Sequence, residues 1–550
     1  MRFALGMLVP IAWRVRGLVA KLRFRFPPLA ANWALACLPL VFLLAVLIAP
    51  ALRLLAEAAA VGSRDAVWLA PLQDPYLRWR VLWSGVQASL TCGLVLLLGL
   101  PMAWVLARLE FAGRSWLLRA LMLPFVVPTL VAAMGVLALA GPQGLWQRWG
   151  GASWQGTPYL LLYGNVFFNL CVLVRAATEA LEQVSASRVA AARTLGATPW
   201  RAFWRIEWPA IAPWLMSALC LVFLYCFAGF GLALVLGGPQ YATVEVEIYT
   251  LVAYELQISQ AGVLAVWTLC LTAPCALAYA ILERRLATPL RADRIPRHRP
   301  QSAGQWLAVG LTVLMLGLVC AAPVLAIVAR AGGAGAAAWA VLLQADTLFA
   351  LWNTLRFSAF ALALATVLGV CHALAAQRWA LLRAMAFLPF VVSPVLVAFG
   401  LLLLYPAWTA SAPLLVAAYA LLAYPFIAKA LASALDGMPA HYMHAAASLG
   451  ASPWRAFWRV RWPLLQPALR RGMAFAAATA VGEFAVTLFL SRPEWATLTT
   501  LIYEHLGRPG QTHYASALVL SCALMALAFA AFMLLEWPGR DDPLNPSRHA

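Results

Sequence analysis

Few residues in this sequence stand where their chemistry could serve a function, and those few are polar side chains inside apolar stretches. Glu483 is one of them, and an ionisable side chain inside an apolar span is costly enough to be a functional candidate by default. Asn165 and Asn169 are four residues apart and would share one face of a helix. We interpret these three residues as candidates for lining a pathway. The alternatives are a capped glutamate near the end of a span and amides that hydrogen-bond between helices.

Catalytic and metal chemistry find no support in the sequence. It contains no paired carboxylates, no HExxH pattern and no serine–histidine–aspartate set at workable spacing. The ten cysteines form no CxxC pair and lie in or beside apolar stretches, as small buried hydrophobic residues do. The two lysines, Lys21 and Lys429, each follow an alanine, which excludes the GxxxxGK loop that cradles nucleotide phosphates. We therefore expect no catalytic residue, no metal ligand, no cofactor bound by this chain and no enzyme activity.

The elements that must position these residues are membrane-spanning helices. Hydrophobic residues make up 64% of the sequence and charged residues 11%, against about 25% charged in soluble proteins. Apolar stretches of about 20 residues, long enough to cross a bilayer, recur along the chain. We expect an all-α polytopic membrane protein with about 12 transmembrane helices. The expected spans are 33–54, 82–107, 118–140, 158–180, 211–236, 261–282, 305–329, 351–376, 384–405, 413–434, 465–490 and 514–536.

The net charge is +19, and arginines crowd the N-terminal segment and the segment 284–304. Clusters of arginine in short segments beside spans are typical of the cytoplasmic side, and they also contact anionic membrane lipid. We favour this interpretation over binding to nucleic acid. It places the N-terminus, the loop 108–117 and the C-terminal tail in the cytoplasm. Glu245 and Glu247 then fall on the outer side, where we expect an ordinary solvated loop.

A short polar passage occurs twice, at 190–209 and at 444–463. From Gly196 and Gly450 onward, eleven of fourteen positions are identical. Other short motifs also recur, so each half holds about six spans in the same orientation. This pattern predicts two parallel repeats with a pathway between them. We expect a first repeat at 1–283, a basic cytoplasmic linker at 284–304 and a second repeat at 305–550.

The repeated passage has a readable local structure. An alanine-rich helix should end at Gly196, where a left-handed residue closes a helix. Thr198 can cap a second helix, and Pro199 suits its first turn. Aromatic residues then follow at helical spacing on one face, beginning with Trp200, while Arg201 lies on another face. Because a mere connector has no reason to keep its sequence in both halves, we interpret both loops, 187–209 and 441–463, as docking devices.

These passages resemble the EAA loop of ABC-importer permeases, E-A-A-x3-G-x9-I-x-L-P. The matching positions are Ala191, Ala192, Gly196, Ile206 and Pro209 in the first copy and Ala445, Ala446, Gly450 and Pro463 in the second. The departures are Ala190 and His444 in place of glutamate and Trp208 and Trp462 in place of leucine. The missing glutamate puts a particular salt bridge to the partner in doubt.

This resemblance implies the partners of the chain. In such permeases the first short helix of each loop is a coupling helix that sits in a groove of a nucleotide-binding subunit. It implies two copies of a cytoplasmic ABC ATPase, which use ATP and Mg, and a periplasmic substrate-binding protein. It also implies a location in the bacterial inner membrane. The docking residues expected from it are Ala191, Ala192, Gly196, Trp200, Arg201, Ala445, Ala446, Gly450, Trp454 and Arg455.

The fused layout resembles the ferric-iron and thiamine importer group, in which one permease chain carries both halves. The stretches 124–146, 165–184 and 229–249 are more similar to the thiamine permeases of that group. We therefore expect thiamine as the cargo, with ferric iron as the alternative. Thiamine is a cation, which Glu483 could attract. A more distant alternative is an ion-coupled secondary transporter, but that class does not predict two nearly identical amphipathic loops.

Overall fold

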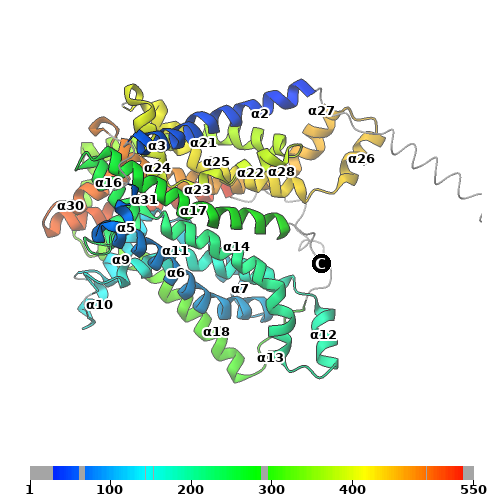
Figure 1. The fold of residues 1–550 in the computed structure, drawn as a ribbon. Helices are drawn as coiled ribbons and strands as arrows, with labels where there is room; N and C mark the ends of the chain where they lie inside the picture. Colours follow the sequence, from blue (N-terminus) through cyan, green and yellow to red (C-terminus); the bar gives the residue numbers. More distant parts are fainter. Residues whose placement is uncertain are drawn as a thin grey trace, which may run out of the picture.

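The computed structural model describes residues 29–60, 68–142, 144–152, 154–286, 295–409, 411–490 and 492–536. The named elements in these ranges are all helices (Figure 1). The basic N-terminal segment, part of the expected linker and the C-terminal tail lie outside the described residues. The all-helical fold predicted from the composition is therefore confirmed for the part of the chain that the structure describes.

The first half begins with a span that contains a π-helical turn. It continues through a long helix (α6), a segment of short helices, a second long helix (α11) and the first copy of the repeated passage. Its elements are α2 (Leu29–Leu43), η1 (Leu44–Ile48), α3 (Ala49–Ala60), α5 (Ala70–Gln73), α6 (Pro75–Arg108), α7 (Arg114–Ala120), α8 (Leu123–Val126), α9 (Thr129–Ala140), α10 (Leu145–Arg148), α11 (Tyr159–Glu182), α12 (Ala186–Thr194), α13 (Pro199–Ala202), η2 (Phe203–Glu207), α14 (Trp208–Phe227), α15 (Phe230–Leu236), α16 (Val244–Ala253) and α17 (Ile258–Leu286).

The second half runs through nearly the same series, again beginning with a span that contains a π-helical turn. Its elements are α18 (Ala303–Leu316), η3 (Gly317–Ala321), α19 (Ala322–Gly332), α20 (Ala336–Trp339), η4 (Ala340–Leu343), α21 (Ala345–Ala376), α22 (Ala380–Met385), α23 (Leu388–Val391), α24 (Pro394–Leu404), η5 (Pro406–Trp408), α25 (Ala412–Asp436), α26 (Ala440–Ser448), α27 (Pro453–Ala456), η6 (Phe457–Arg461), α28 (Trp462–Val481), α29 (Ala485–Leu490), η7 (Pro493–Trp495), α30 (Leu498–Gly507) and α31 (Gln511–Glu536).

The number of spans differs slightly from the expected twelve. Within the described residues, ten helices are long and apolar enough to cross a membrane, and a bent pair makes eleven if it counts as one span. The bent pair is Leu382–Val391 with Pro394–Leu404, at 96° to each other, where we expected the continuous span 384–405. Pro394 begins the second arm, because proline suits the first turn of a helix and not its interior.

The expected span 465–490 is not one of these candidates, and the structure divides it into two helices. Its first part, α28, ends at Val481 and carries two arginines, Arg470 and Arg471. Gly482 and Glu483 then interrupt the helix before α29. The equivalent span 211–236 breaks at the matching place, between α14 and α15. The two breaks face a common cavity, described below.

Each half lends its first span to the other half. α3 packs against α24, and α19 packs against α9. Both contacts are backbone to backbone: a Cβ on Gly400 would lie 2.9 Å from the carbonyl oxygen of Pro50, and one on Gly135 would lie 2.8 Å from that of Pro323. Small residues at such crossings let helices approach closely in a membrane. The sequence pattern did not reveal this exchange.

The two copies of the repeated passage project from the same end of the molecule. Figure 1 shows α12 and α13 at the lower right and α26 and α27 at the upper right, while α16 and α30 lie at the opposite end. This arrangement fits two parallel repeats, since an inverted pair would place the two copies at opposite ends.

Candidate functional site

The two projecting loops have the same backbone geometry. Each consists of a helix, a glycine and a second short helix: Gly196 has φ +83° and Gly450 has φ +76°. These values lie in the left-handed region, which glycine adopts without steric cost. The next helix is capped in both copies: the hydroxyl of Thr198 accepts the Arg201 N–H and that of Ser452 accepts the Arg455 N–H, both at 3.3 Å. The helix–glycine–helix form predicted from the sequence is thus present in both loops.

The tips of the two loops expose the same apolar surface. Leu195 and Leu449 are each 88% exposed, and Trp200 and Trp454 are each 69% exposed. Exposed apolar patches of this kind are typical of interaction sites. Among the other expected docking residues, Ala192 is half-buried, Ala446 is buried, and Ala191, Arg201, Ala445 and Arg455 are exposed.

The base of the first loop is held by charged pairs. Arg108 and Glu207 are both nearly buried and form a salt bridge of 2.6 Å between α6 and η2. Glu182, at the end of α11, pairs with Arg114 at 2.8 Å and with Arg297 at 2.9 Å. The base of the second loop has the pair Arg383–Asp436 at 3.1 Å, and it is more exposed. The two loops are therefore alike at their tips and unlike at their bases.

The described part of the expected linker lies against the first half. His298 forms a parallel bridge with Leu109: the Glu110 N–H donates to the His298 carbonyl at 2.9 Å, and the His298 N–H donates to the Arg108 carbonyl at 3.1 Å. The pair of Arg297 with Glu182 adds a second attachment. The linker thus attaches to the same helix ends that carry the first loop.

A cavity of about 270 Å³ lies between the two halves. Equivalent residues from both repeats line it, which places it at the pseudo-symmetric centre of the molecule. The paired lining residues include Phe125 with Phe390, Val127 with Val392, Phe230 with Phe484 and Gly229 with Glu483. The interrupted helices thus bring their breaks to this cavity, as the half-helices of transporters commonly do.

All three pathway candidates line this one cavity: Asn165, Asn169 and Glu483. Glu483 stands at the break between α28 and α29, and its Oε1 accepts the Val486 N–H at 3.0 Å. It is therefore also a helix cap, as the alternative interpretation held. The Asn165 Nδ2 donates to Gln87 Oε1 at 2.7 Å, which is the other alternative, a hydrogen bond between helices. These side chains thus line the cavity and also make structural hydrogen bonds, so the candidate role and its alternatives are compatible. Their role in transport stays a prediction.

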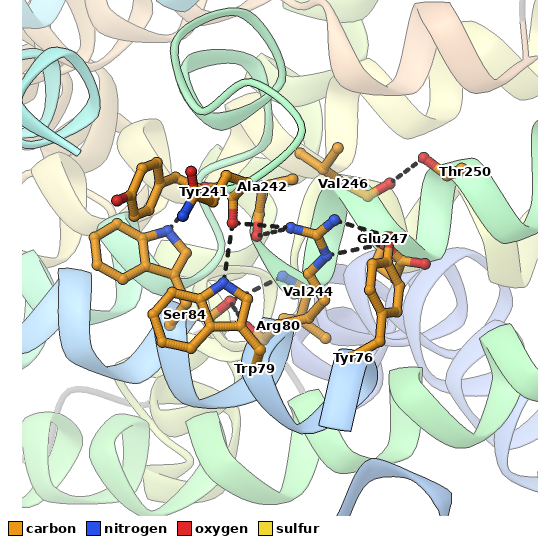
Figure 2. Close-up of polar contacts among 12 residues, drawn as sticks. Tyr76, Trp79, Arg80, Ser84, Tyr241, Ala242, Val244, Val246, Glu247 and Thr250 are labelled. Carbon is orange, nitrogen blue, oxygen red and sulfur yellow. Dashed lines mark hydrogen bonds and ion pairs between the residues drawn. The ribbon is translucent and has the colours of Figure 1, made fainter. Parts of the chain in front are cut away.

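At the outer end, two glutamates are buried where we expected a solvated loop. Glu245 is 0% exposed and Glu247 is 4% exposed. Glu247 forms a salt bridge with Arg80 at 3.3 Å and accepts the Tyr76 hydroxyl at 2.8 Å. Figure 2 shows Arg80 lying between this carboxylate and the carbonyl of Ala242, to which it donates at 3.4 Å. Glu245 was misjudged for the same reason, because its carboxylate accepts the Ser393 hydroxyl of the other half at 2.7 Å.

These acids share a short helix, α16, with apolar residues that are mostly buried. Because Val244, Val246, Ile248 and Leu251 are buried, the helix lies inside the fold and its glutamates need partners there. The run VEVEIY contained a signal for this burial. In a helix, residues that alternate along the chain spread around the whole circumference, so a helix with acids between apolar residues cannot keep its acids in water and its apolar residues buried. The partner residues lie far away in the sequence and gave no signal.

Comparison with known proteins identifies the molecule further. The family model described as "Binding-protein-dependent transport system inner membrane component" matches residues 96–288 and again residues 380–538. The chain belongs to this family. Its members are permease subunits of ABC importers, so this chain is an importer permease. The second range lies within the expected second half, and the first extends from the expected first half to residue 288, past the boundary expected at 283. The boundaries at 283 and 305 stay predictions.

Individual relatives of this importer permease cover nearly all of it. The Thiamine transport system permease protein ThiP of Escherichia coli K12 is 30% identical over 86% of this chain and 91% of the relative. The protein of the same name from Salmonella typhimurium is 29% identical over 94% of this chain and 98% of the relative. A Sulfate transport system permease protein CysW from Synechocystis is 31% identical, over 38% of this chain and 75% of the relative.

The permease is accordingly a multi-pass protein of the bacterial inner membrane. This location and the resemblance to the thiamine permeases of this class, both inferred from the sequence, are confirmed by the relatives and by the apolar helices. The relatives are transport components rather than enzymes. In this family a permease works with an ATPase and a binding protein.

Proposed function

We propose that this permease imports thiamine, delivered by a periplasmic binding protein, through the interface of its two halves. The observation that carries the proposal is the 30% identity to a thiamine permease over 86% of the chain, a share that extends over both halves. The sulfate permease matches 38% of the chain, about the length of one repeat. Similarity over one repeat supports the general architecture, while similarity over both supports the cargo.

The absence of a metal-binding cluster disfavours the ferric-iron alternative. No group of three or more histidine, cysteine, aspartate or glutamate side chains that could hold a metal ion occurs among the described residues. A hard cation such as Fe³⁺ is held by several oxygen or nitrogen ligands together. An organic cation needs only one carboxylate and apolar surroundings, which the central cavity has.

Force for transport would enter through the two loops. Each exposes a leucine and a tryptophan at a rigid helix–glycine–helix turn, so two equal tips can sit in two copies of one ATPase subunit. When the ATPases close on ATP, the tips move together and the two halves rock around the cavity. The docking residues would be Ala191, Ala192, Gly196, Trp200, Arg201, Ala445, Ala446, Gly450, Trp454 and Arg455. ATP and Mg belong to the partner subunits, and this chain would bind no cofactor.

The test is uptake into vesicles that contain the permease, its ATPase and its binding protein. We expect ATP-dependent uptake of thiamine and none of ferric iron. Uptake that follows an ion gradient without ATP would instead indicate a secondary transporter. Uptake of iron in place of thiamine would overturn the proposed cargo and leave the importer architecture intact.

The docking role has its own test in Gly196→Pro and Gly450→Pro. Proline fixes φ near −65°, so neither variant can form the turn at φ +83° or +76°. We expect normal membrane insertion with loss of thiamine uptake and of ATPase binding. The matched control is Gly150→Pro, at a positive-φ glycine outside the repeated passage, which should leave uptake and ATPase binding unchanged. Normal ATPase binding by both loop variants would refute the docking role.

A further inference from the structure

The central cavity has a one-sided electrostatic character. Glu483 is the one carboxylic acid among the side chains that line it, and no lysine, arginine or histidine is among them. The equivalent position in the first half is Gly229, so the carboxylate has no symmetric counterpart. Behind the wall, the Lys429 ammonium lies 5.7 Å from the centroid of the Phe390 ring, and it is paired with Glu283 at 3.3 Å. Glu483 thus favours a cation over an anion in this low-dielectric cavity. The acid of the cavity wall therefore belongs to the second half, whereas Asn165 and Asn169 belong to the first.

Several hydrogen-bond donors of the cavity wall are used inside the protein. The amide nitrogen of Asn165 donates to Gln87, and that of Asn169 donates to the Asn165 carbonyl at 2.9 Å and to Cys226 at 3.3 Å. The Thr479 hydroxyl donates to a backbone carbonyl at 2.9 Å. The side-chain oxygens of Asn165, Asn169 and Glu483 can accept hydrogen bonds, so a ligand with N–H donors suits this part of the wall.

Aromatic rings from both halves line the cavity. Phe230 and Phe484 stack with their centroids 6.0 Å apart, one ring from each half. In a second group, the ring centroid of Phe426 lies 6.1 Å from that of Phe125 and 5.7 Å from that of Phe390. Ring faces attract cations and stack on flat apolar groups. The volume of about 270 Å³ is just below the range of about 300–1,000 Å³ usual for ligand pockets, so a small ligand fits.

We propose that this cavity is a binding site, within the permease itself, for a small aromatic cation that donates hydrogen bonds. Glu483 is the counter-ion, the carbonyl oxygens of Asn165 and Asn169 accept the ligand's N–H groups, and the phenylalanine rings hold its flat body. The charge of the ligand points to the second half, because the first half has Gly229 at the matching position. The identification of thiamine as the natural ligand rests on the proposed function. The existence of a cation site in the cavity does not.

A clean probe of the site is Glu483→Gln. The present carboxylate caps α29 through the Val486 N–H, and a glutamine oxygen can accept the same hydrogen bond. The variant therefore removes the charge and keeps the cap. Glu483→Asp keeps the charge on a shorter side chain, and Glu494→Gln removes an exposed acid from the same half as a control.

The experiment is equilibrium binding to the full-length permease in lipid nanodiscs, without the binding protein. The probes are thiamine, benzamidinium as a simple aromatic cation with N–H groups, and sulfate as an anion. We expect saturable binding of both cations with a dissociation constant of about 1 mM or below and no binding of sulfate. Glu483→Gln should weaken cation binding by about tenfold to a hundredfold, since a hydrogen bond to a charged group is lost. Glu483→Asp should keep the preference for cations, and Glu494→Gln should bind as the unaltered chain does.

The outcomes separate this inference from the proposed function. If the complete importer takes up thiamine but the permease binds neither cation up to about 1 mM, the cavity site is wrong and the cargo stands. If the permease binds benzamidinium through Glu483 but the importer does not transport thiamine, the site stands and the cargo is wrong. Equal cation binding by the unaltered chain and Glu483→Gln, with Glu494→Gln also unchanged, would overturn the role of the carboxylate.

Discussion

The exchange of first spans between the halves can be tested at two glycines, Gly135 and Gly400. A Cβ at Gly135 would lie 2.8 Å from the Pro323 carbonyl oxygen, and a Cβ at Gly400 would lie 2.9 Å from that of Pro50. Both neighbours are backbone atoms, which cannot rotate away as a flexible side chain can. Alanine at either position must therefore push two helices of opposite halves apart.

The expected size follows from two opposing terms. Alanine in place of glycine inside a helix adds about 1 kcal/mol of helix propensity. Inserting a methyl group into a packed contact costs about 1–3 kcal/mol. Gly310→Ala is the matched control, because Gly310 lies inside α18 with no atom within 4 Å of its Cβ position. Relative to this control, Gly135→Ala and Gly400→Ala should each lose about 1–3 kcal/mol of stability, and the double variant about twice as much because the sites are separate.

The assay is unfolding of the purified permease, followed by tryptophan fluorescence in one detergent for all four variants. We expect Gly310→Ala to unfold at or above the midpoint of the unaltered chain and the two interface variants to unfold below the control. If Gly135→Ala and Gly400→Ala were as stable as Gly310→Ala, the close contacts between the halves would not exist and the exchange of first spans would be refuted.

Two further predictions concern charged and titratable groups. Glu207→Ala leaves the buried Arg108 guanidinium without its carboxylate and should lower the free energy of unfolding by about 3–5 kcal/mol in the same assay. Glu179→Ala, which breaks the exposed pair with Arg175, should lower it by less than about 1 kcal/mol. Equal losses in the two variants would contradict the buried pair. Burial, together with Arg508 and His513, holds the pKa of His505 below its usual value, so the folded state binds fewer protons than the unfolded chain and stability should fall as pH drops below about 6.5. His505→Gln should show a smaller loss between about pH 7.5 and pH 5.5, and an equal loss would assign the pH dependence to other groups.

The sequence was sufficient for features that depend on local chemistry. Gly196 and Thr198 determine the turn and cap of the first loop by their own backbone and side-chain preferences, and Gly450 and Ser452 do the same in the second. The hydropathy pattern was likewise sufficient for the class of fold. Glu483 was identifiable because an acid in an apolar span is unusual, whatever its neighbours are.

The sequence was not sufficient for features that depend on distant partners. Hydropathy does not indicate that a span is interrupted, because Gly229 and Gly482 are compatible with an apolar stretch whether the helix continues or not. It also does not indicate which helices meet, since all spans are apolar on the lipid side. Glu247 was misplaced for this reason: its burial depends on Arg80, and nothing in the spacing of the two residues links them.

The crossed first spans impose an order on biosynthesis. Residue 50 enters the bilayer long before residue 400 is made, and at about 5–20 residues per second the interval is roughly 20–70 s. Throughout that time the flank of α3 that will meet α24 lacks this partner, although α17 of the first half can already pack against α3. A ribosome that stops in the second half would release a chain whose opening helix lacks its contact with α24, which quality-control proteases could recognise as a feature of an unfinished product.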